Sequence, residues 1–176
     1  MLAALLGLVF ALVTAEARSD EDEDHGIAPA AALRTSELSA PTPRELPGAT
    51  TIRTSQLRER MQSETKPLLF DVLGGEAHLS LPGAIWLPGA GRGESLQDAV
   101  QAQLAKTLQA ATKGDRMRPL VFFCQGPQCW LSYNAALRAV ALGYGAVVWY
   151  RGGIEAWLAA GGELAPLRLT WRKPGG

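Results

Sequence analysis

The segment Pro119-Leu-Val-Phe-Phe-Cys124 runs directly into Gln125-Gly-Pro-Gln-Cys129-Trp130. A short uninterrupted apolar run beside turn residues is typical of a strand that is buried on both faces. Gly126 and Pro127 interrupt the run before a helical segment starts. The stretch therefore predicts Cys124 at the tip of a buried strand. Cys124 and Cys129 are the only two cysteines of the chain, so any sulfur chemistry is expected here.

Strand and helix patterns alternate on both sides of this segment. Because helices between apolar strands imply crossover connections, the pattern predicts an α/β fold with a mainly parallel central sheet and helices on both faces. Ligands of such sheets bind beyond the carboxyl ends of the strands, which is where Cys124 is expected. Strands are predicted over 50–52, 68–73, 84–87, 120–123 and 147–150, and another over 167–171; helices are predicted over 54–61, 94–112, 128–142 and 154–160.

The N-terminal region predicts export. Residues 2–13 form an apolar run too short to span a bilayer, and Ala15-Glu-Ala17 fits a signal-peptidase site. We expect a signal peptide over 1–17 and a periplasmic protein, with a buried N-terminal helix as the alternative. Acidic residues and prolines predict a disordered leader over 18–49. A folded domain is expected over 50–164 and a C-terminal tail over 165–176.

Composition limits the classes of partner. The 17 basic and 17 acidic residues balance, which argues against nucleic acid or an anionic membrane as the main partner. Hydrophobic residues make up 47% of the chain, enough for a full core. Two cysteines and two scattered histidines do not make a zinc site, and no metal or cofactor is expected.

Four ordered motifs resemble the rhodanese-like family over roughly residues 50–162. They are Leu69-Phe-Asp-Val72, Leu81-Pro-Gly-Ala-Ile85, Val121-Phe-Phe-Cys124 with its loop, and Gly152-Gly-Ile-Glu-Ala-Trp157. The resemblance implies a sulfurtransferase, similar to thiosulfate sulfurtransferases. Cys124 would be the nucleophile that carries sulfur as a persulfide.

A narrower resemblance concerns exported rhodanese-like proteins with a paired-cysteine-Trp motif (CXXCW type), associated with quinoprotein (pyrroloquinoline quinone, PQQ) catabolism. It rests on Pro82-Gly-Ala-Ile-Trp-Leu-Pro-Gly89, on Cys129-Trp-Leu-Ser-Tyr-Asn-Ala-Ala136, and on Gly143-Tyr144 with Trp149-Tyr150. The resemblance implies a periplasmic quinoprotein system as partner. It also implies an alternative function, that of a non-enzymatic accessory protein.

The chain departs from the family pattern at three positions. Leu73 follows the Asp-Val pair where Arg is common, and Ser80 precedes the Pro-Gly turn motif where His is common. Cys129 stands where thiosulfate-using members often carry Arg. Since no Lys or Arg lies between Cys124 and Leu137, a dianionic donor would lack a charged partner in the loop.

The loop after Cys124 is the candidate anion-binding site. We expect the loop backbone from Gln125 to Trp130 to surround the sulfur with N–H groups. The donors would come from Gln125, Gly126, Gln128, Cys129 and Trp130, since Pro127 has no N–H. Gly126 would supply a positive φ, and Pro127 would stiffen the loop. The positive end of the following helix would also favour a thiolate or persulfide.

Cys129 leaves three interpretations open. Cys124 can take sulfur from a small donor or a protein thiol and pass it on. Alternatively, Cys129 can attack a persulfide or sulfenic acid on Cys124 and close a disulfide, which makes the pair a thiol-disulfide redox module. The third interpretation is a plain stabilising disulfide, which gains little from so short a loop.

Four polar residues have two interpretations each. Asp71 either helps to orient the loop or is a strand-end carboxylate satisfied by backbone N–H groups. Arg151 follows the last core strand and either supplies positive charge to the site or is solvated. Ser132 and Asn134 either pin the loop or are ordinary polar positions of a helix.

Overall fold

The computed structural model describes residues 20–169 and contains a six-stranded sheet in which every strand pair is parallel. The predicted α/β fold is therefore confirmed. The strand order is β1-β6-β5-β2-β4-β8, which puts β5 near the middle. The strands are β1 (Thr50–Ile52), β2 (Leu68–Asp71), β4 (Ile85–Trp86), β5 (Leu120–Phe123), β6 (Val147–Tyr150) and β8 (Arg168–Leu169), with β3 (Leu79–Ser80) and β7 (Ala165–Pro166) forming a separate antiparallel pair.

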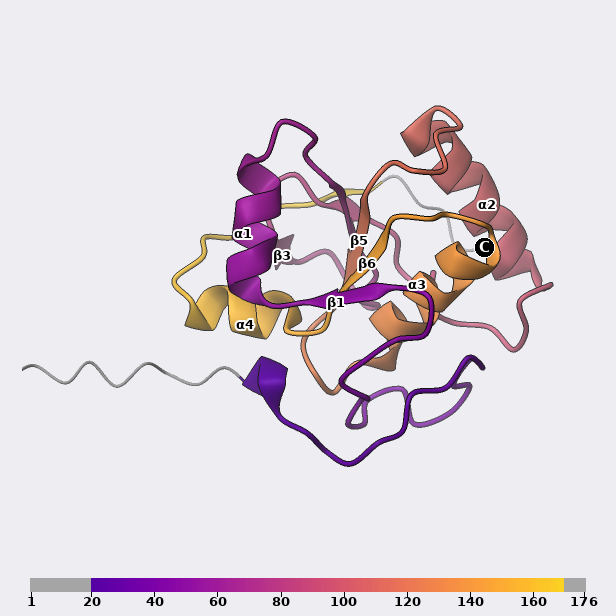
Figure 1. Cartoon of the computed structure of the whole chain (residues 1–176), viewed down its shortest axis with the longest axis horizontal. Coiled ribbons are helices and arrows are strands. Elements are labelled where there is room, and N and C mark those ends of the chain that lie inside the picture. The colour runs from indigo at the N-terminus through magenta and orange to yellow at the C-terminus, as the bar shows by residue number, and fades with distance from the viewer. Residues whose placement is uncertain (1–19, 170–176) are drawn as a thin grey trace, which may run out of the picture.

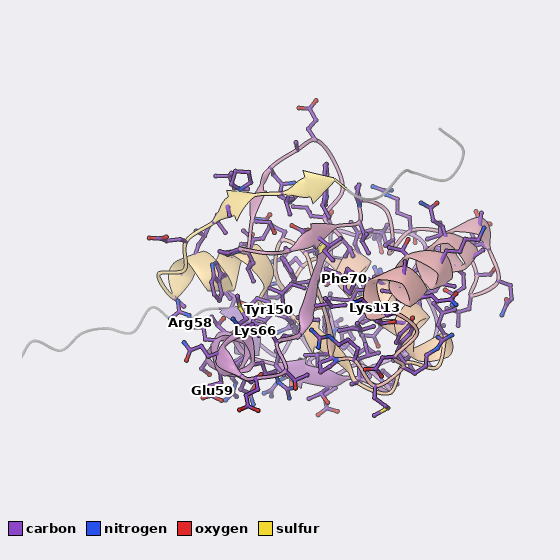
Figure 2. All side chains as sticks on the ribbon, turned by 90° about the horizontal axis from the view of Figure 1, so that it is seen from above. Arg58, Glu59, Lys66, Phe70, Lys113 and Tyr150 are labelled. Carbon is purple, nitrogen blue, oxygen red and sulfur yellow. A yellow bond between two sulfur atoms is a disulfide. The ribbon has the colours of Figure 1, made fainter. Side chains whose placement is uncertain are left out.

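Helices cover both faces of the sheet (Figure 1). One core cluster joins α1 (Thr54–Gln62) and α4 (Gly153–Ala159) to the strands. The other joins α2 (Ala99–Thr112) and α3 (Trp130–Ala141) to the opposite face. In Figure 2 Phe70 and Tyr150 lie inside the molecule, and they belong to different clusters. Within residues 20–169 no helix has the length and apolar character needed to cross a bilayer.

The helix predicted from residue 94 begins later, at Ala99. Asp98 is its N-cap and accepts a hydrogen bond from the N–H of Gln101. The same carboxylate binds buried Arg138 of α3, which ties the start of α2 to α3. Burial alone would raise the pKa of Asp98, but the hydrogen bonds from Arg138 and from backbone N–H groups outweigh it and lower the pKa to about 2. Because an N-cap side chain favours helix formation from the next residue, the helix begins at Ala99 and residues 94–98 belong to the preceding loop.

Residues 20–49, which we call the strap, differ from the disordered leader predicted from the sequence. They contain one 3₁₀ turn, η1 (Asp20–Asp22), and otherwise little regular structure. The strap nevertheless lies along one end of the domain, below α4 and α3 in Figure 1. Thr42, Pro43 and Leu46 are buried. Several backbone N–H and C=O groups of the strap form hydrogen bonds with side chains of α3 and not within a helix or strand of the strap itself. Its prolines, which disfavour helix and strand, therefore do not prevent it from packing. The predicted signal peptide lies outside the described residues.

Candidate functional site

Cys124 lies at the carboxyl end of β5, as the sequence predicts. Its strand runs between β2 and β6, and α3 begins six residues later at Trp130. Its side chain belongs to the core cluster on the α2 and α3 face, and the residue is 1% exposed. The position is the one at which open α/β sheets bind ligands, although in this state the sulfur is covered.

Cys124 and Cys129 form a disulfide. Their Cα atoms are 6.4 Å apart, within the usual range for such bonds. Cys129 is the N-cap residue of α3 but makes no side-chain cap hydrogen bond. The described part of the chain holds no free cysteine. The structure thus brings together the two thiols on which the sequence interpretations depend, in their oxidised form.

The predicted bowl of amides around the sulfur is not formed in this state. Within residues 20–169 no backbone N–H donates to Sγ of Cys124. The N–H of Cys129 donates to the carbonyl of Gly126, and the N–H of Trp130 donates to the carbonyl of Leu38 in the strap. The disulfide turns Sγ towards Cys129, and the strap takes up the amide at the start of α3. The anion cradle is therefore a prediction for the reduced state only.

Gly126 also differs from its predicted role. Its φ is not positive. A Cβ at this position would overlap Oε2 of Glu155. Glycine makes room here for the carboxylate of Glu155 on α4, which also accepts a hydrogen bond from the side chain of Gln125.

Ser132 touches the sulfur of Cys124. Its Oγ lies 3.1 Å from Sγ of Cys124 and 3.3 Å from the carbonyl oxygen of Cys129. The indole N–H of Trp149 donates to the same Oγ at 3.0 Å. Ser132 is therefore one of the residues that pin the loop, the first of the two interpretations that its sequence position allowed. Trp149 was not predicted to take part, since a buried Trp in a strand indicates core packing.

The turn at Gly152-Gly153 forms one support of the loop. The N–H groups of Ile154 and Glu155 donate to the carbonyls of Cys124 and Gln125, at 3.0 and 2.9 Å. Gly153 has a φ of 58°, and a Cβ there would overlap the carbonyl oxygen of Cys124. This close approach explains physically why position 153 is a glycine.

The strap forms the other support. The N–H and Oγ1 of Thr42 both donate to the carbonyl of Pro127, at 3.0 and 2.6 Å. Arg151 holds Thr42 in turn: it donates to Oγ1 and to the carbonyl of Thr42, and also to the carbonyl of Glu21. Burial lowers the pKa of Arg151, and the nearby charge of Arg44 adds to this. Arg151 is thus neither solvated nor directed at the sulfur, because the strap takes its donors.

Further contacts fasten the strap to α3. The indole N–H of Trp130 donates to the carbonyl of Pro41, and the hydroxyl of Tyr133 pairs with both backbone groups of Ala30. The side chain of Asn134 pairs with both backbone groups of Arg34. Sequence reasoning missed these partners. The one signal for them is the recurrence of leucines among the prolines, at Leu33, Leu38 and Leu46.

Asp71 does not face the cysteine loop. Its carboxylate accepts hydrogen bonds from the N–H of Leu73, the hydroxyl of Ser80 and Nε2 of His78. Phe123, its register partner on β5, belongs to the α1 and α4 face, whereas Cys124 belongs to the other face. Asp71 is therefore a satisfied strand-end carboxylate. Within residues 20–169 no group of His, Cys, Asp and Glu side chains could hold a metal ion.

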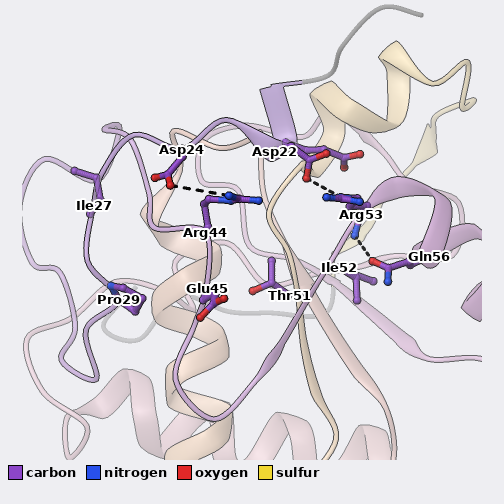
Figure 3. Close-up of a pocket in the computed structure, with 11 residues that line it drawn as sticks. Asp22, Asp24, Ile27, Pro29, Arg44, Glu45, Thr51, Ile52, Arg53 and Gln56 are labelled. Atoms are coloured by element: carbon purple, nitrogen blue, oxygen red, sulfur yellow. Dashed lines mark hydrogen bonds and ion pairs between the residues drawn. The ribbon is translucent and has the colours of Figure 1, made fainter.

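One hollow lies away from the cysteines. It has a volume of about 550 Å³ between the strap and the start of β1 and α1, and no cysteine lines it (Figure 3). Two ion pairs line it, Asp22 with Arg53 and Asp24 with Arg44. A smaller hollow of about 220 Å³ is lined by Pro127 of the loop. Size alone therefore does not identify the functional site.

Comparisons with known proteins agree with this geometry. The family model described as "Rhodanese-like domain" matches residues 53–160, more than half of the chain. Among solved structures, thiosulfate sulfurtransferase from Pseudomonas aeruginosa is similar at 16% identity and a TM-score of 0.53, over 73% of this chain and 22% of that one. Wild-type EanB is similar at 18% identity and a TM-score of 0.53, over 70% and 33%.

This chain thus spans less than two thirds of either protein, and at these identities the likeness concerns the fold. No curated protein sequence matches the chain. The family match includes β5, the cysteine loop, α3 and the Gly152-Gly153 turn, and leaves the strap outside. The chain belongs to the rhodanese-like domain family.

Proposed function

We propose that the chain is an exported sulfur carrier with chemistry like that of a thiosulfate sulfurtransferase, in which Cys124 is the nucleophile and Cys129 the resolving thiol. The observation that carries the proposal is the disulfide between these residues at the carboxyl end of β5 in a rhodanese-like domain. One structure of the similar protein EanB holds ergothioneine covalently linked with a persulfide, which supports persulfide chemistry on this fold.

The cycle starts from the reduced pair. The thiolate of Cys124 attacks the outer sulfur of a sulfane donor, the S–S bond of the donor breaks, and the rest of the donor leaves with the electron pair. An acceptor thiolate then removes the outer sulfur and regenerates the thiolate of Cys124. In competition, the thiolate of Cys129 attacks the inner sulfur, hydrosulfide leaves, and the disulfide forms. External thiols reduce this disulfide and are themselves oxidised.

The charges around the loop favour a donor of low charge. No Lys or Arg lies in the loop, and Arg151 gives its donors to Glu21 and Thr42. Glu155 instead places a carboxylate beside Gln125. A thiosulfate dianion would find no charge partner at these positions, so a low-molecular-weight persulfide or a protein persulfide fits better.

The disulfide also favours a second function, that of a thiol-disulfide redox module. Its reduction potential separates the two. A potential in the range of catalytic exchange proteins supports exchange with partner thiols, whereas a much lower potential indicates a structural bond.

We place the protein in the periplasm on its N-terminal apolar run and Ala15-Glu-Ala17, and near a quinoprotein oxidation system on the resemblance of its motifs alone. A persistent disulfide is compatible with an oxidising compartment. Recovery of the tagged chain from a periplasmic fraction with its thiols oxidised would support the location. Co-purification of a quinoprotein would support an accessory role, most strongly if it survives Cys124→Ser.

The proposal is tested by intact-mass spectrometry of the reduced protein after incubation with a low-molecular-weight persulfide. We expect a mass gain of one sulfur atom on part of the wild-type protein and no gain on Cys124→Ser. A gain on Cys124→Ser, or none on either protein while both remain folded, would refute the assignment of Cys124.

A further inference from the structure

The two sulfurs of the disulfide have different surroundings. Cys124 is 1% exposed and Cys129 is 8% exposed. The Sγ of Cys124 lies 3.1 Å from the hydroxyl oxygen of Ser132, whereas the side chain of Cys129 makes no cap hydrogen bond with α3. An attacking thiol can break the bond at either sulfur, and the sulfur that is not attacked leaves as a thiolate. The surroundings of the two sulfurs therefore influence which sulfur is attacked and which one leaves as the thiolate.

The hydroxyl of Ser132 has one proton and two neighbours that can accept it. Because an indole N–H is a donor only, Trp149 occupies a lone pair of Oγ and leaves the serine proton free to point elsewhere. A disulfide sulfur is a weak acceptor, so the proton goes to the carbonyl of Cys129 in the oxidised state. Once Cys124 is a thiolate, its sulfur is the stronger acceptor, and rotation about the Cβ–Oγ bond redirects the proton to it.

We propose that Ser132, oriented by Trp149, is a positioning residue that makes Cys124 the leaving thiolate and Cys129 the sulfur attacked when a thiol opens the disulfide. The proposal rests on the function proposed above and adds the order of events. The incoming thiolate bonds to the sulfur of Cys129, the S–S bond breaks, and its electron pair stays on Cys124. A second thiol then releases Cys129, and the two external thiols leave as a disulfide.

Charged groups near the loop do not offer a competing explanation. Asp71 on β2 is bound by Ser80 and His78, and Glu155 on α4 lies beside Gln125. The donors of Arg151, at the end of β6, go to the strap.

Arg34 of the strap lies over the ring of Trp130, with its guanidinium carbon 4.9 Å from the ring centroid, and Arg138 of α3 is bound to Asp98. Among the described side chains, the only hydroxyl in contact with the sulfur of Cys124 is that of Ser132. Because burial disfavours the charged thiolate of Cys124, the hydrogen bond from Ser132 should have a measurable effect on the stability of that thiolate.

The first test locates the attack. The oxidised protein is mixed with a limiting amount of a small monothiol, quenched in acid, and sequenced by tandem mass spectrometry. We expect the mixed disulfide on Cys129 and a free thiol at Cys124. A mixed disulfide mainly on Cys124 would overturn the proposed direction.

The second test measures the effect of the hydroxyl. In Cys129→Ser the only thiol is Cys124, and the pH profile of its alkylation gives its pKa. A hydrogen bond to a charged group contributes about 1.5 kcal/mol, so Ser132→Ala should raise this pKa by about one unit. Ser132→Thr keeps the hydroxyl and should restore the profile. Trp149→Phe should shift the pKa in the same direction by less, and exposed Ser55→Ala is the control.

The outcomes separate this inference from the proposed function. If Cys129→Ser with Ser132→Ala still accepts sulfur on Cys124, but its alkylation profile equals that of Cys129→Ser alone (the parent), the positioning role is refuted and the function stands. If the parent itself accepts no sulfur, the function fails whatever the profile. Should Ser132→Ala not fold, Trp149→Phe and the trapping experiment still decide the inference.

Discussion

The loop from Cys124 to Trp130 has two supports that are built differently. At the Gly152-Gly153 turn, backbone donates to backbone, and Gly153 lies so close to the carbonyl of Cys124 that no side chain fits. At the strap, the main contacts run through side chains: Thr42 to Pro127, Arg151 to Thr42, and Trp130 to Pro41. The turn is fixed by backbone hydrogen bonds and a close backbone contact, whereas the strap adds several side-chain hydrogen bonds to its backbone bonds with Pro127 and Trp130.

This difference assigns different tasks to the two supports. The turn lies within the residues matched by the family model, and the strap precedes them. The turn therefore belongs to the rhodanese-like fold and sets the position of Cys124. The strap is an addition that occupies the N–H of Trp130 and covers the loop. We infer that changes at the turn affect stability most, while changes at the strap affect access to the disulfide.

The largest effect is expected from Gly153→Ala. The new Cβ would overlap the carbonyl of Cys124 and would also carry an unfavourable positive φ, so unfolding free energy should fall by about 3 kcal/mol. Urea denaturation should show this loss of stability as a lower midpoint with an unchanged slope. The matched control is Gly114→Ala: Gly114 also has a positive φ, of 84°, but no atom lies within 4 Å of its Cβ position. Equal losses in the two variants would contradict the steric account.

A smaller loss is expected from Arg151→Leu, and it should be confined largely to the strap. The variant loses three hydrogen bonds from a charged group to Glu21 and Thr42, a loss of about 2 kcal/mol. We expect faster hydrogen exchange over residues 20–46 and faster tryptic cleavage at Arg34 and Arg44. Arg58→Leu is the control, because Arg58 binds Ala160 outside the strap. An unchanged strap in Arg151→Leu would show that Arg151 does not hold it.

Thr42→Val keeps the shape of the side chain and removes one hydroxyl. That hydroxyl accepts from Arg151 and donates to Pro127, so its loss should cost about 1 kcal/mol. The rate at which a monothiol opens the disulfide should rise several-fold, because the loop is less covered. Thr35→Val, at an exposed position of the same strap, should leave the rate unchanged. A slower rate in Thr42→Val would mean that the strap assists opening.

The smallest effect on the hydrogen bonding of the strap is expected from Trp130→Phe. The variant keeps a phenyl ring and loses the indole N–H to the carbonyl of Pro41, a partly buried bond that contributes about 0.5 kcal/mol. Hydrogen exchange should increase near Pro41 and remain constant at the Gly152-Gly153 turn. An increase at both places would show that the two supports are coupled.

The two supports also differ in how far sequence could predict them. Apolar runs and glycine positions are local signals, and they predicted the central strands, α3 and the turn after β6. The strap was predicted to be disordered because its acidic residues and prolines disfavour helix and strand. Its order instead comes from pairings about 100 residues away in the chain, such as Arg34 with Asn134. Single-sequence patterns do not identify such pairs; the leucines of the strap indicate at most that it packs, and not against what.

At the site itself, the sequence predicted the position of Cys124 and the involvement of Cys129. It did not predict which donors the sulfur finds. A positive φ at Gly126 and a bowl of amides were expected, whereas the glycine makes room for Glu155 and the hydroxyl of Ser132 contacts the sulfur. These details depend on the side chains of α4 and of the strap, which meet the loop only in the folded protein.

The most direct test of the central claim compares the fate of one transferred sulfur in wild type and in Cys129→Ser. Both proteins are reduced, loaded with an isotopically labelled low-molecular-weight persulfide, and followed by intact mass and by assay of released hydrosulfide. We predict that Cys129→Ser keeps the label as a persulfide on Cys124, while the wild type releases it as hydrosulfide and closes the Cys124–Cys129 disulfide. Equal release from both proteins, or no label on Cys124 in either, would contradict the account.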